Sequence, residues 1–324
     1  MFIINKLISR RINKKISKGC NRQALALDCF NRANSFLYGG RIKKAQGYMR
    51  CYRKLIDYDT FLKIDNRKDK LPELSVIIVA YRTNKLLLDC ISSVIKNREK
   101  VYEIIIVDNG GNDDVEDELK KMEILYIKTP QNLIPSEGRN IGVHFARGKI
   151  IAFLDDDALV AENYVKTVSN AFSTYDICGF RGRVLPKGKT SENKRIQHYD
   201  LGGIPVPSII NIEGNSAFRK SVYLEMNGMD PLLFGHEGWD LSLRIAGKYG
   251  SESLIYWPET VIYHDYSDNM KRRDNKRDRH SIMSDFVKRK NRKAAKYRRK
   301  LKKYIQNEQT RVKGERLLKR RIGE

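Results

Sequence analysis

The stretch Ile150–Asp157 reads IIAFLDDD, a short apolar run that ends in three consecutive aspartates. An apolar run of this length is typical of a buried strand. Three adjacent carboxylates at the end of such a strand repel one another, and burial makes that costly unless a cation lies nearby. A divalent ion relieves the repulsion and also binds a diphosphate. An acid after a strand can instead cap the next helix, but a cap uses one residue, so the run favours a metal site.

The residues on either side alternate between strand and helix patterns, which predicts an open α/β sheet with helices on both faces. We predict strands at Leu74–Ala80, Tyr102–Val107, Ile124–Lys128 and Ile150–Leu154, and helices at Asn84–Asn97, Asp113–Met122 and Ser136–Ala146. In such sheets ligands bind at the carboxyl ends of the strands. The polar residues after the strands therefore mark the expected site, namely Ala80–Arg82, Asp108–Gly111 and Asp155–Asp157.

Four motifs in order along the chain resemble family 2 glycosyltransferases of the GT-A fold. They are SVIIVAYR (Ser75–Arg82), EIIIVDNG (Glu103–Gly110), EGRNIG (Glu137–Gly142) and FLDDD (Phe153–Asp157). Any one motif alone is weak, but their shared order and spacing are specific. The resemblance implies a Rossmann-like open mixed sheet. It also implies inverting transfer of a sugar from a nucleoside diphosphate sugar, with Mg²⁺ or Mn²⁺ bound at the aspartates.

The same resemblance implies roles for single residues on the donor side. Asp108 would contact the nucleobase, Asp155 would hold the ribose and Asp157 would coordinate the metal. The nucleotide-sugar contacts implied in this way are Ala80, Tyr81, Arg82, Asp108, Arg139, Asp155 and Asp156. The guanidinium of Arg139 can offset diphosphate charge with paired hydrogen bonds. Its alternative role is an ion pair with one of the nearby carboxylates.

The second half of the chain contains GNSAFR (Gly214–Arg219) and FGHEGWDLSLR (Phe234–Arg244). These segments resemble the acceptor half of bacterial polysaccharide synthases and of galactosyl- or N-acetylgalactosaminyltransferases. That family usually has Glu-Asp-x-Asp or Glu-Asp-x-Glu here, with the first Asp as general base, whereas this chain has Gly238 at that place. We predict Glu237 as the base and keep Asp240 as the alternative, although an acid one turn into a helix more often anchors it. A departure from the inverting scheme also stays open.

Two residues of this half are predicted to contact the acceptor. Asn215 lies in the first of the two segments, and Trp239 comes after Gly238 in the second. The Trp239 ring would form a floor on which an acceptor sugar stacks, and ordinary core packing is the alternative for it.

His264 comes directly after a predicted strand at Val261–Tyr263. A lone histidine is more often structural, but the resemblance places here a histidine that completes the metal and diphosphate site. Neutral imidazole is a suitable third ligand for Mn²⁺. The predicted metal ligands are therefore Asp157, Asp155 and His264, while His198 and His236 are interpreted as structural.

Charge divides the chain into three parts. The net charge is +24, but residues 1–70 carry 18 Lys and Arg against 5 Asp and Glu, and residues 271–324 carry 23 against 6. We predict a basic helical N-terminal extension (1–70), a GT-A domain (71–270) and a basic, solvated and partly helical C-terminal tail (271–324). In the first part, Ile4, Ile8, Ile12 and Ile16 recur every four residues, so the helix they predict either lies on an anionic membrane or packs on the protein itself. A helical hairpin at Gln23–Ile56 is expected to pack on the GT-A domain.

Other features narrow the location and the class of protein. Five scattered cysteines without a C-x-x-C pair indicate reduced thiols in the cytoplasm, and no apolar run reaches the ~20 residues that span a bilayer. We therefore expect a cytoplasmic protein, peripheral at the inner face of the membrane, whose basic ends bind anionic headgroups. A slightly acidic centre between two basic ends argues against a nucleic-acid partner.

The predicted function is metal-dependent transfer of a hexose or N-acetylhexosamine from a UDP-sugar to a hydroxyl of a glycan or lipid-linked acceptor. One alternative is a degenerate, non-catalytic core with basic arms that bind membrane or nucleic acid, which Gly238 keeps open. The other is a nucleotidyltransferase, but such enzymes generally have a glycine-rich loop after the first strand, and Tyr81–Asn84 contains no glycine.

Overall fold

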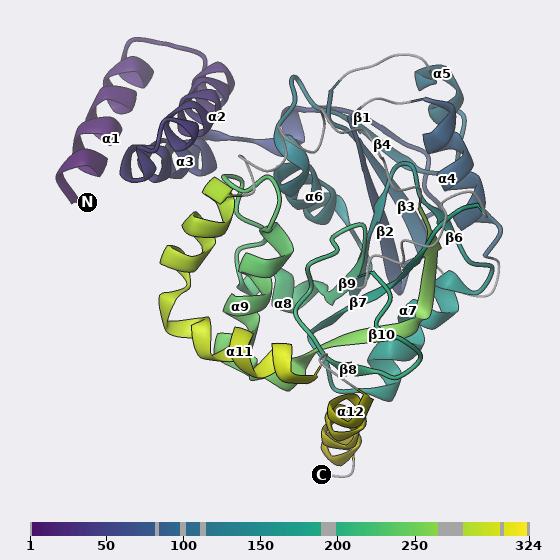
Figure 1. The fold of residues 1–324 in the computed structure, drawn as a ribbon. Coiled ribbons are helices and arrows are strands. Elements are labelled where there is room, and N and C mark those ends of the chain that lie inside the picture. The colour runs from purple at the N-terminus through teal and green to yellow at the C-terminus, as the bar shows by residue number, and fades with distance from the viewer. Residues whose placement is uncertain are drawn as a thin grey trace.

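A computed structural model gives the structure of the chain and describes residues 2–81, 84–97, 102–110, 115–188, 199–264, 281–304 and 308–322. A single mixed sheet forms its centre, with helices on both faces (Figure 1). The strand order is β1 (Leu62–Asp65), β4 (Leu125–Lys128), β3 (Tyr102–Asp108), β2 (Leu74–Ala80), β5 (Ile150–Asp155), β9 (Asn215–Arg219), β7 (Gly179–Leu185), β10 (Leu254–Tyr263) and β6 (Leu159–Val160), with β8 (Val206–Pro207) paired to β10.

The direction of the strands decides which residues meet at each edge of the sheet. Strands β4, β3, β2 and β5 run parallel, so their carboxyl ends lie together. Strand β9 runs antiparallel to β5 with Asn215 opposite Leu154, and its first residues therefore lie beside the last residues of β5. Strand β7 is antiparallel to β9, and β10 is parallel to β7. Strand β10 therefore runs in the same direction as β5, and its end reaches the same edge.

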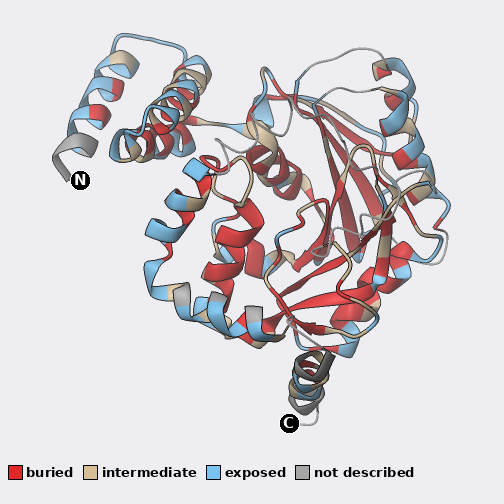
Figure 2. Cartoon of the chain, viewed as in Figure 1, coloured by how far each residue is buried: buried red, intermediate tan, exposed pale blue. Residues whose placement is uncertain are grey.

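The central strands are buried on both faces, as Figure 2 shows in red. Successive side chains of β2 alternate between two hydrophobic clusters, with Ile77 in one and Val76 and Ile78 in the other. One face is covered by α6 (Ile134–Phe145), α8 (Lys220–Glu225) and α9 (Glu237–Tyr249), and the other by α4 (Lys85–Ile95), α5 (Glu116–Leu119) and α7 (Tyr164–Thr174). Two covered faces explain why the strands read as continuous apolar runs.

The α/β pattern predicted from the sequence is confirmed. Strand β2 has the predicted bounds, and β3, β4, β5, α4 and α6 differ from prediction by one or two residues at an end. Strand β10 is longer than the predicted Val261–Tyr263. Edge strand β1 was not predicted, and it places residues 62–65 of the predicted N-terminal extension in the sheet, antiparallel to β4.

The N-terminal residues form three helices, α1 (Phe2–Ser17), α2 (Arg22–Tyr38) and α3 (Ile42–Leu55), and then a short 3₁₀ helix at Tyr58–Thr60. Ile8 and Ile12 are buried against the rest of the protein, so this part of the isoleucine stripe packs on the molecule itself. The predicted α2–α3 hairpin is present and contacts the sheet domain. The hydroxyls of Tyr52 and Tyr58 donate to the Glu137 carboxylate of α6, at 2.6 and 2.5 Å.

Several residues of the C-terminal segment are packed in the core, so the predicted tail is not solvated throughout. Residues 281–290 are helical and precede the 3₁₀ residues Arg292–Ala294, α11 (Ala295–Tyr304) and α12 (Glu308–Ile322). Met283, Phe286 and Val287 are buried in the core cluster that includes α9. A few apolar residues among many Lys and Arg are enough to anchor such a segment in the core. A prediction based on charge composition alone overlooks them. Within the described residues, no helix combines the length and apolar character needed to span a bilayer.

The buried C-terminal segment makes a prediction for stability. Replacing Phe286 with Ala should lower the free energy of unfolding by about 3 to 5 kcal/mol, because it leaves a cavity in the core. Ile282 lies on the same helical segment but is 36% exposed, so Ile282→Ala should cost well under half as much. Urea denaturation of the full chain measures both. Equal small losses would show that the segment is not part of the core.

Candidate functional site

Arg139 is brought to the carboxyl edge of the sheet by the close packing of α6 on β2. A Cβ on Gly138 would lie 2.5 Å from Cγ1 of Val79, and one on Gly142 would overlap Cγ2 of Ile77. Only glycine allows the helix backbone to approach the strand this closely. The start of the helix is also anchored, because Leu133 N–H donates to Oδ1 of Asn109 at the end of β3, at 2.9 Å. The two glycines of EGRNIG therefore explain the position of the arginine between them.

Arg139, a residue only 7% exposed, has its guanidinium between two carboxylates from different elements. Its Nη1 is 3.0 Å from Oε1 of Glu237 at the start of α9, and its Nη2 is 3.4 Å from Oδ1 of Asp155 at the end of β5. Burial opposes the charge of the arginine, but the surrounding acids hold its pKa above the ordinary value. The geometry is compatible with both predicted roles, since the arginine pairs with carboxylates at the place where a diphosphate is expected.

The three aspartates after β5 have different environments. The pKa of Asp156 is raised to about 7, first by burial and then by the charges of Asp157 and Asp155. Asp157 is paired instead, with its Oδ1 3.0 Å from Nε2 of His264. Burial raises the pKa of Asp157, but His264 outweighs this and holds it below the ordinary value. The same pair raises the pKa of His264 against the effect of its burial.

These contacts bear on where a divalent ion could bind. Among the residues that the structure describes, no three His, Cys, Asp or Glu side chains are gathered as a metal site. Asp157 and His264 do meet and are partly exposed, whereas Asp155 turns towards Arg139. A carboxylate beside an imidazole suits Mn²⁺, and ions of this kind commonly take their other ligands from phosphates and water. The chemistry of the pair therefore fits such an ion.

The residues predicted to bind the nucleotide gather at the ends of β2 and β3. Ala80 is buried, its carbonyl accepts Asn109 N–H at 2.7 Å, and the exposed Tyr81 ring lies against Gly110. Asp108 is fully buried, and its Oδ2 accepts the Tyr126 hydroxyl at 2.7 Å. Arg82 lies outside the described residues. The structure thus brings these positions together with the aspartates of β5, and Asp156 accepts the backbone N–H of Tyr81.

Glu237 is presented by a strained turn at the start of α9. Gly235 and His236 both have positive φ, 87° and 68°, and the second is unusual for a residue with a side chain. Glu237 is 4% exposed, and its Oε2 has no hydrogen-bond partner among the described residues. Burial raises the pKa of Glu237, while Arg139 opposes the shift. The predicted base is therefore the ion-pair partner of the predicted diphosphate ligand.

The contacts of Asp240 are those of an anchor. It is fully buried and receives Nε of Arg244, Nζ of Lys290 and Nδ2 of Asn291, at 2.9, 2.9 and 2.7 Å. Its carboxylate thus fastens the C-terminal segment to α9, in keeping with the anchoring role that its place one turn into the helix indicates. Both of its oxygens are engaged and the side chain is fully buried, so Asp240 is not placed to meet a substrate.

Neither predicted acceptor residue is placed to touch an acceptor. Asn215 is fully buried, and its Nδ2 donates to the carbonyls of Arg183 and Thr260 at 2.9 and 3.1 Å, which joins β9 to its neighbours. Trp239 is 6% exposed and lies edge-on to the His236 ring in the core cluster. These side chains hold the fold around the site, and sequence alone did not separate that role from binding.

Glu213 belongs to this group of charges but was not predicted. Its Oε1 accepts the backbone N–H of Gly238 at 2.8 Å. The pKa of Glu213 is raised to about 7, first by burial and then by the charge of Glu237, while Arg139 opposes the shift. The only signal in the sequence is an acid before the GNSAFR segment, at the amino end of a strand. Its antiparallel pairing with β5 could not be read from that.

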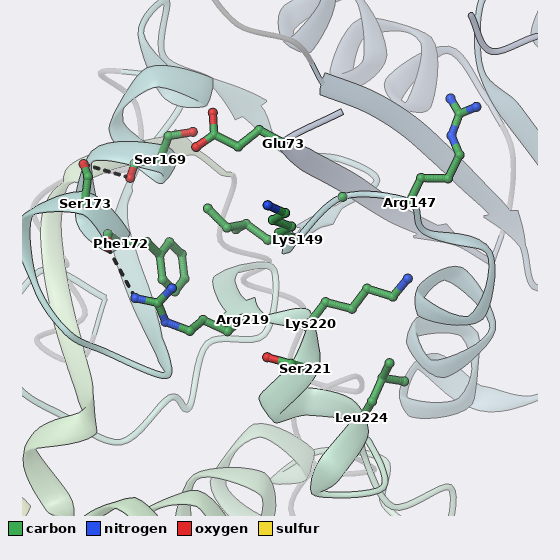
Figure 3. Close-up of a pocket in the computed structure, with 12 residues that line it drawn as sticks. Glu73, Arg147, Lys149, Ser169, Phe172, Ser173, Arg219, Lys220, Ser221 and Leu224 are labelled. Carbon is green, nitrogen blue, oxygen red and sulfur yellow. Dashed lines mark hydrogen bonds between the residues drawn. The ribbon is translucent and has the colours of Figure 1, made fainter. Parts of the chain in front are cut away.

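A surface hollow lies far from these residues. It has a volume of about 680 Å³, and its lining includes Glu73, Lys149, Arg219 and Lys220 (Figure 3). Glu73 precedes β2 and Lys149 precedes β5, so this hollow lies at the amino ends of the strands. Ligands of open α/β sheets bind at the other edge, which is where the aspartates, Arg139 and Glu237 lie.

Comparison with known proteins identifies the class that this fold and site define, which is the GT-A glycosyltransferases. Residues 75–226 match the family model of Glycosyl transferase family 2. An uncharacterised glycosyltransferase of Haemophilus influenzae is 26% identical over 205 residues, covering 57% of this chain and 76% of the relative. The uncharacterised glycosyltransferase RC0461 of Rickettsia conorii is 34% identical over 97 residues, covering 29% of this chain.

These matches cover only part of the known proteins, which limits what can be inferred from them about this chain. The match spans only 16% of the length of the Rickettsia relative. The crystal structure of GalNAc-T7 with UDP, GalNAc and Mn²⁺ superposes with a TM-score of 0.50 at 20% identity, covering 61% of this chain and 45% of that one. At that identity the likeness establishes the shared fold.

The buried ion pair makes a testable prediction. Arg139→Met should lower the free energy of unfolding by about 3 to 5 kcal/mol, because it leaves the Glu237 charge buried without its cation. Adding Glu237→Gln removes that charge, so the double variant should regain part of the loss. Urea denaturation of the two single variants and the double variant gives the coupling energy. Strictly additive losses would contradict a direct pair.

Proposed function

We propose that this chain transfers a hexosyl or N-acetylhexosaminyl group from a UDP-sugar to a hydroxyl of a glycan or lipid-linked acceptor, with a divalent metal ion. The observation that carries the proposal is the group of Asp155, Asp157, His264 and Arg139 at the carboxyl edge of the sheet. Acids with an imidazole on one side and a guanidinium on the other match what a metal-bound diphosphate needs. The match of residues 75–226 to a glycosyltransferase family supports sugar transfer.

On the donor side, each group has a separate task. Asp157 and His264 would hold Mn²⁺ or Mg²⁺, which supplies positive charge to the leaving diphosphate when bound. Arg139 would place its guanidinium against the same oxygens, where charge develops as the sugar–phosphate bond breaks. Its contact with Asp155 is long, at 3.4 Å, so a diphosphate oxygen can replace it while Glu237 keeps the side chain in place.

The nucleoside would occupy the ends of β2 and β3. Tyr81 offers an exposed ring beside Gly110, which suits stacking with a base, and Arg82 is proposed as a further contact, while the fully buried Asp108 would support the end of β3 through Tyr126. Asp155 is the proposed ribose ligand, since its side chain is 41% exposed. UDP as the donor nucleotide draws support from GalNAc-T7, whose structure contains UDP, GalNAc and Mn²⁺.

A location at the inner face of a membrane is also part of the proposal, because both ends of the chain are strongly basic. Anionic headgroups attract such segments at about 1 kcal/mol per Lys or Arg near the surface. The protein would then bind the membrane through its basic residues and not by inserting the isoleucine stripe, since Ile8 and Ile12 are buried.

The test begins with donor binding and turnover. Purified full-length protein with Mn²⁺, four UDP-sugars (glucose, galactose and their N-acetylamino forms) and a panel of p-nitrophenyl glycosides should release UDP. Asp157→Asn should weaken binding of UDP with Mn²⁺ at least about tenfold, because it removes a ligand charge. Isothermal titration measures the binding and a coupled assay measures UDP.

The matched control is Asp176→Asn, an aspartate 87% exposed in its side chain near the opposite edge of the sheet. It should leave both readouts unchanged. Unchanged binding in Asp157→Asn would refute the metal role. Salt-sensitive binding to RNA or to anionic vesicles, without any binding of UDP and Mn²⁺, would favour the non-catalytic alternative.

A further inference from the structure

The space beside Gly238 is filled by a carboxylate from another part of the chain. A Cβ on Gly238 would lie 2.7 Å from Oε1 of Glu213 and 2.7 Å from the carbonyl oxygen of Ile210. The Gly238 N–H, in the first turn of α9, donates to that Glu213 oxygen at 2.8 Å. A side chain at position 238 and the Glu213 carboxylate in its present place therefore exclude each other.

The backbone places Glu213 next to the donor side of the site. Because β9 is antiparallel to β5, Gly214 lies beside the end of β5, and its carbonyl accepts Asp155 N–H at 3.3 Å. A Cβ on Gly214 would overlap the Asp155 carboxylate. Glu213 is thus one residue from direct contact with the proposed ribose ligand, and it also lies at the start of the acceptor-side helix.

Of the acids in this region, Glu213 has the contacts that a proton acceptor needs. Glu237 is ion-paired with Arg139, and Asp240 is saturated by Arg244, Lys290 and Asn291. Glu213 is of intermediate exposure, and among the described residues no Lys or Arg forms a salt bridge with it, although the charge of Arg139 acts on it from nearby. Because Glu213 is not fully buried and has no salt bridge of its own among those residues, a substrate hydroxyl can approach it.

We propose that Glu213 is the general base of the transfer and supplies from the loop before β9 the carboxylate that Gly238 lacks; this rests on the proposed function. The acceptor hydroxyl gives its proton to Glu213 while its oxygen forms a bond to the anomeric carbon. The bond between that carbon and the diphosphate oxygen breaks, and its electron pair leaves with UDP. Glu213 then holds the proton, and the product has the inverted anomeric configuration.

The electrostatics agree with this role. Burial and the charge of Glu237 on α9 raise the pKa of Glu213 to about 7, against Arg139 on α6. Arg181 on β7 and Tyr199 also interact with it electrostatically. A base is most effective when its pKa lies near the working pH. Because the base acts deprotonated, kcat/KM of the wild type should rise with pH through about 7 and then level off.

The experiment compares Glu213→Gln with Glu237→Gln, using the best pair of donor and p-nitrophenyl glycoside found for the wild type. Loss of a general base lowers kcat about 10²- to 10⁴-fold. Glu213→Gln should show that loss, with binding of UDP and Mn²⁺ changed less than about threefold, and should lose the rise with pH. Glu237→Gln should weaken UDP binding, because Glu237 positions Arg139. Formate should restore part of the activity of Glu213→Ala by entering the space of the missing carboxylate.

Other results would overturn the assignment of Glu213 as the base. A Glu213→Gln variant that keeps kcat within about threefold of the wild type, or a product that retains the donor's anomeric configuration by NMR, overturns the assignment. So does a large loss of kcat in Glu237→Gln alone with donor binding intact, which would return the base to Glu237. Circular dichroism of each variant checks folding. Absence of turnover in the wild type with every donor and acceptor defeats the proposed function itself, and this assignment with it.

Discussion

The site depends on an excess of carboxylates over cationic side chains at one edge of the sheet. In the part of the chain that the structure describes, Asp155, Glu213 and Glu237 surround one buried guanidinium, that of Arg139. One guanidinium cannot neutralise three carboxylates in a place of low dielectric, so the excess is relieved by proton uptake or by a cation from outside. The raised pKa of Glu213 is the first kind of relief. The divalent ion proposed beside Asp157 and His264 would be the second, and it would tie the stability of this edge to donor binding.

Glycines decide which charges can approach one another here. Gly138 lets α6 lie against β2 and so places Arg139, Gly214 leaves room for the Asp155 carboxylate, and Gly238 leaves room for that of Glu213. A side chain at any of these positions would displace a charged group. Gly238 therefore need not mark a degenerate site, because the same absence of a side chain admits a different carboxylate.

Local sequence pattern was enough to predict the sheet and the edge at which its acidic residues gather. Strand β2 and the acids after β5 are recognisable from apolar runs and their polar ends, and parallel strands bring those ends together. Features that depend on pairing between distant segments could not be predicted. Glu213 joins the site only because β9 is antiparallel to β5, and Asn215 and Trp239 are buried by neighbours that no local pattern reveals. The same applies to Phe286, an isolated apolar residue in a basic segment that finds its partners in the core.

The basic ends of the chain have a structural role that their charge alone does not indicate. Each end holds one of the two helices that carry the site residues. On α6, the hydroxyls of Tyr52 and Tyr58 hold Glu137, two residues before Arg139. On α9, Lys290 and Asn291 hold Asp240, three residues after Glu237. Arg139 and Glu237 pair with each other across these helices, so both ends of the chain fix the geometry of the ion pair from outside. Loss of either contact would therefore act on the proposed donor site through this ion pair.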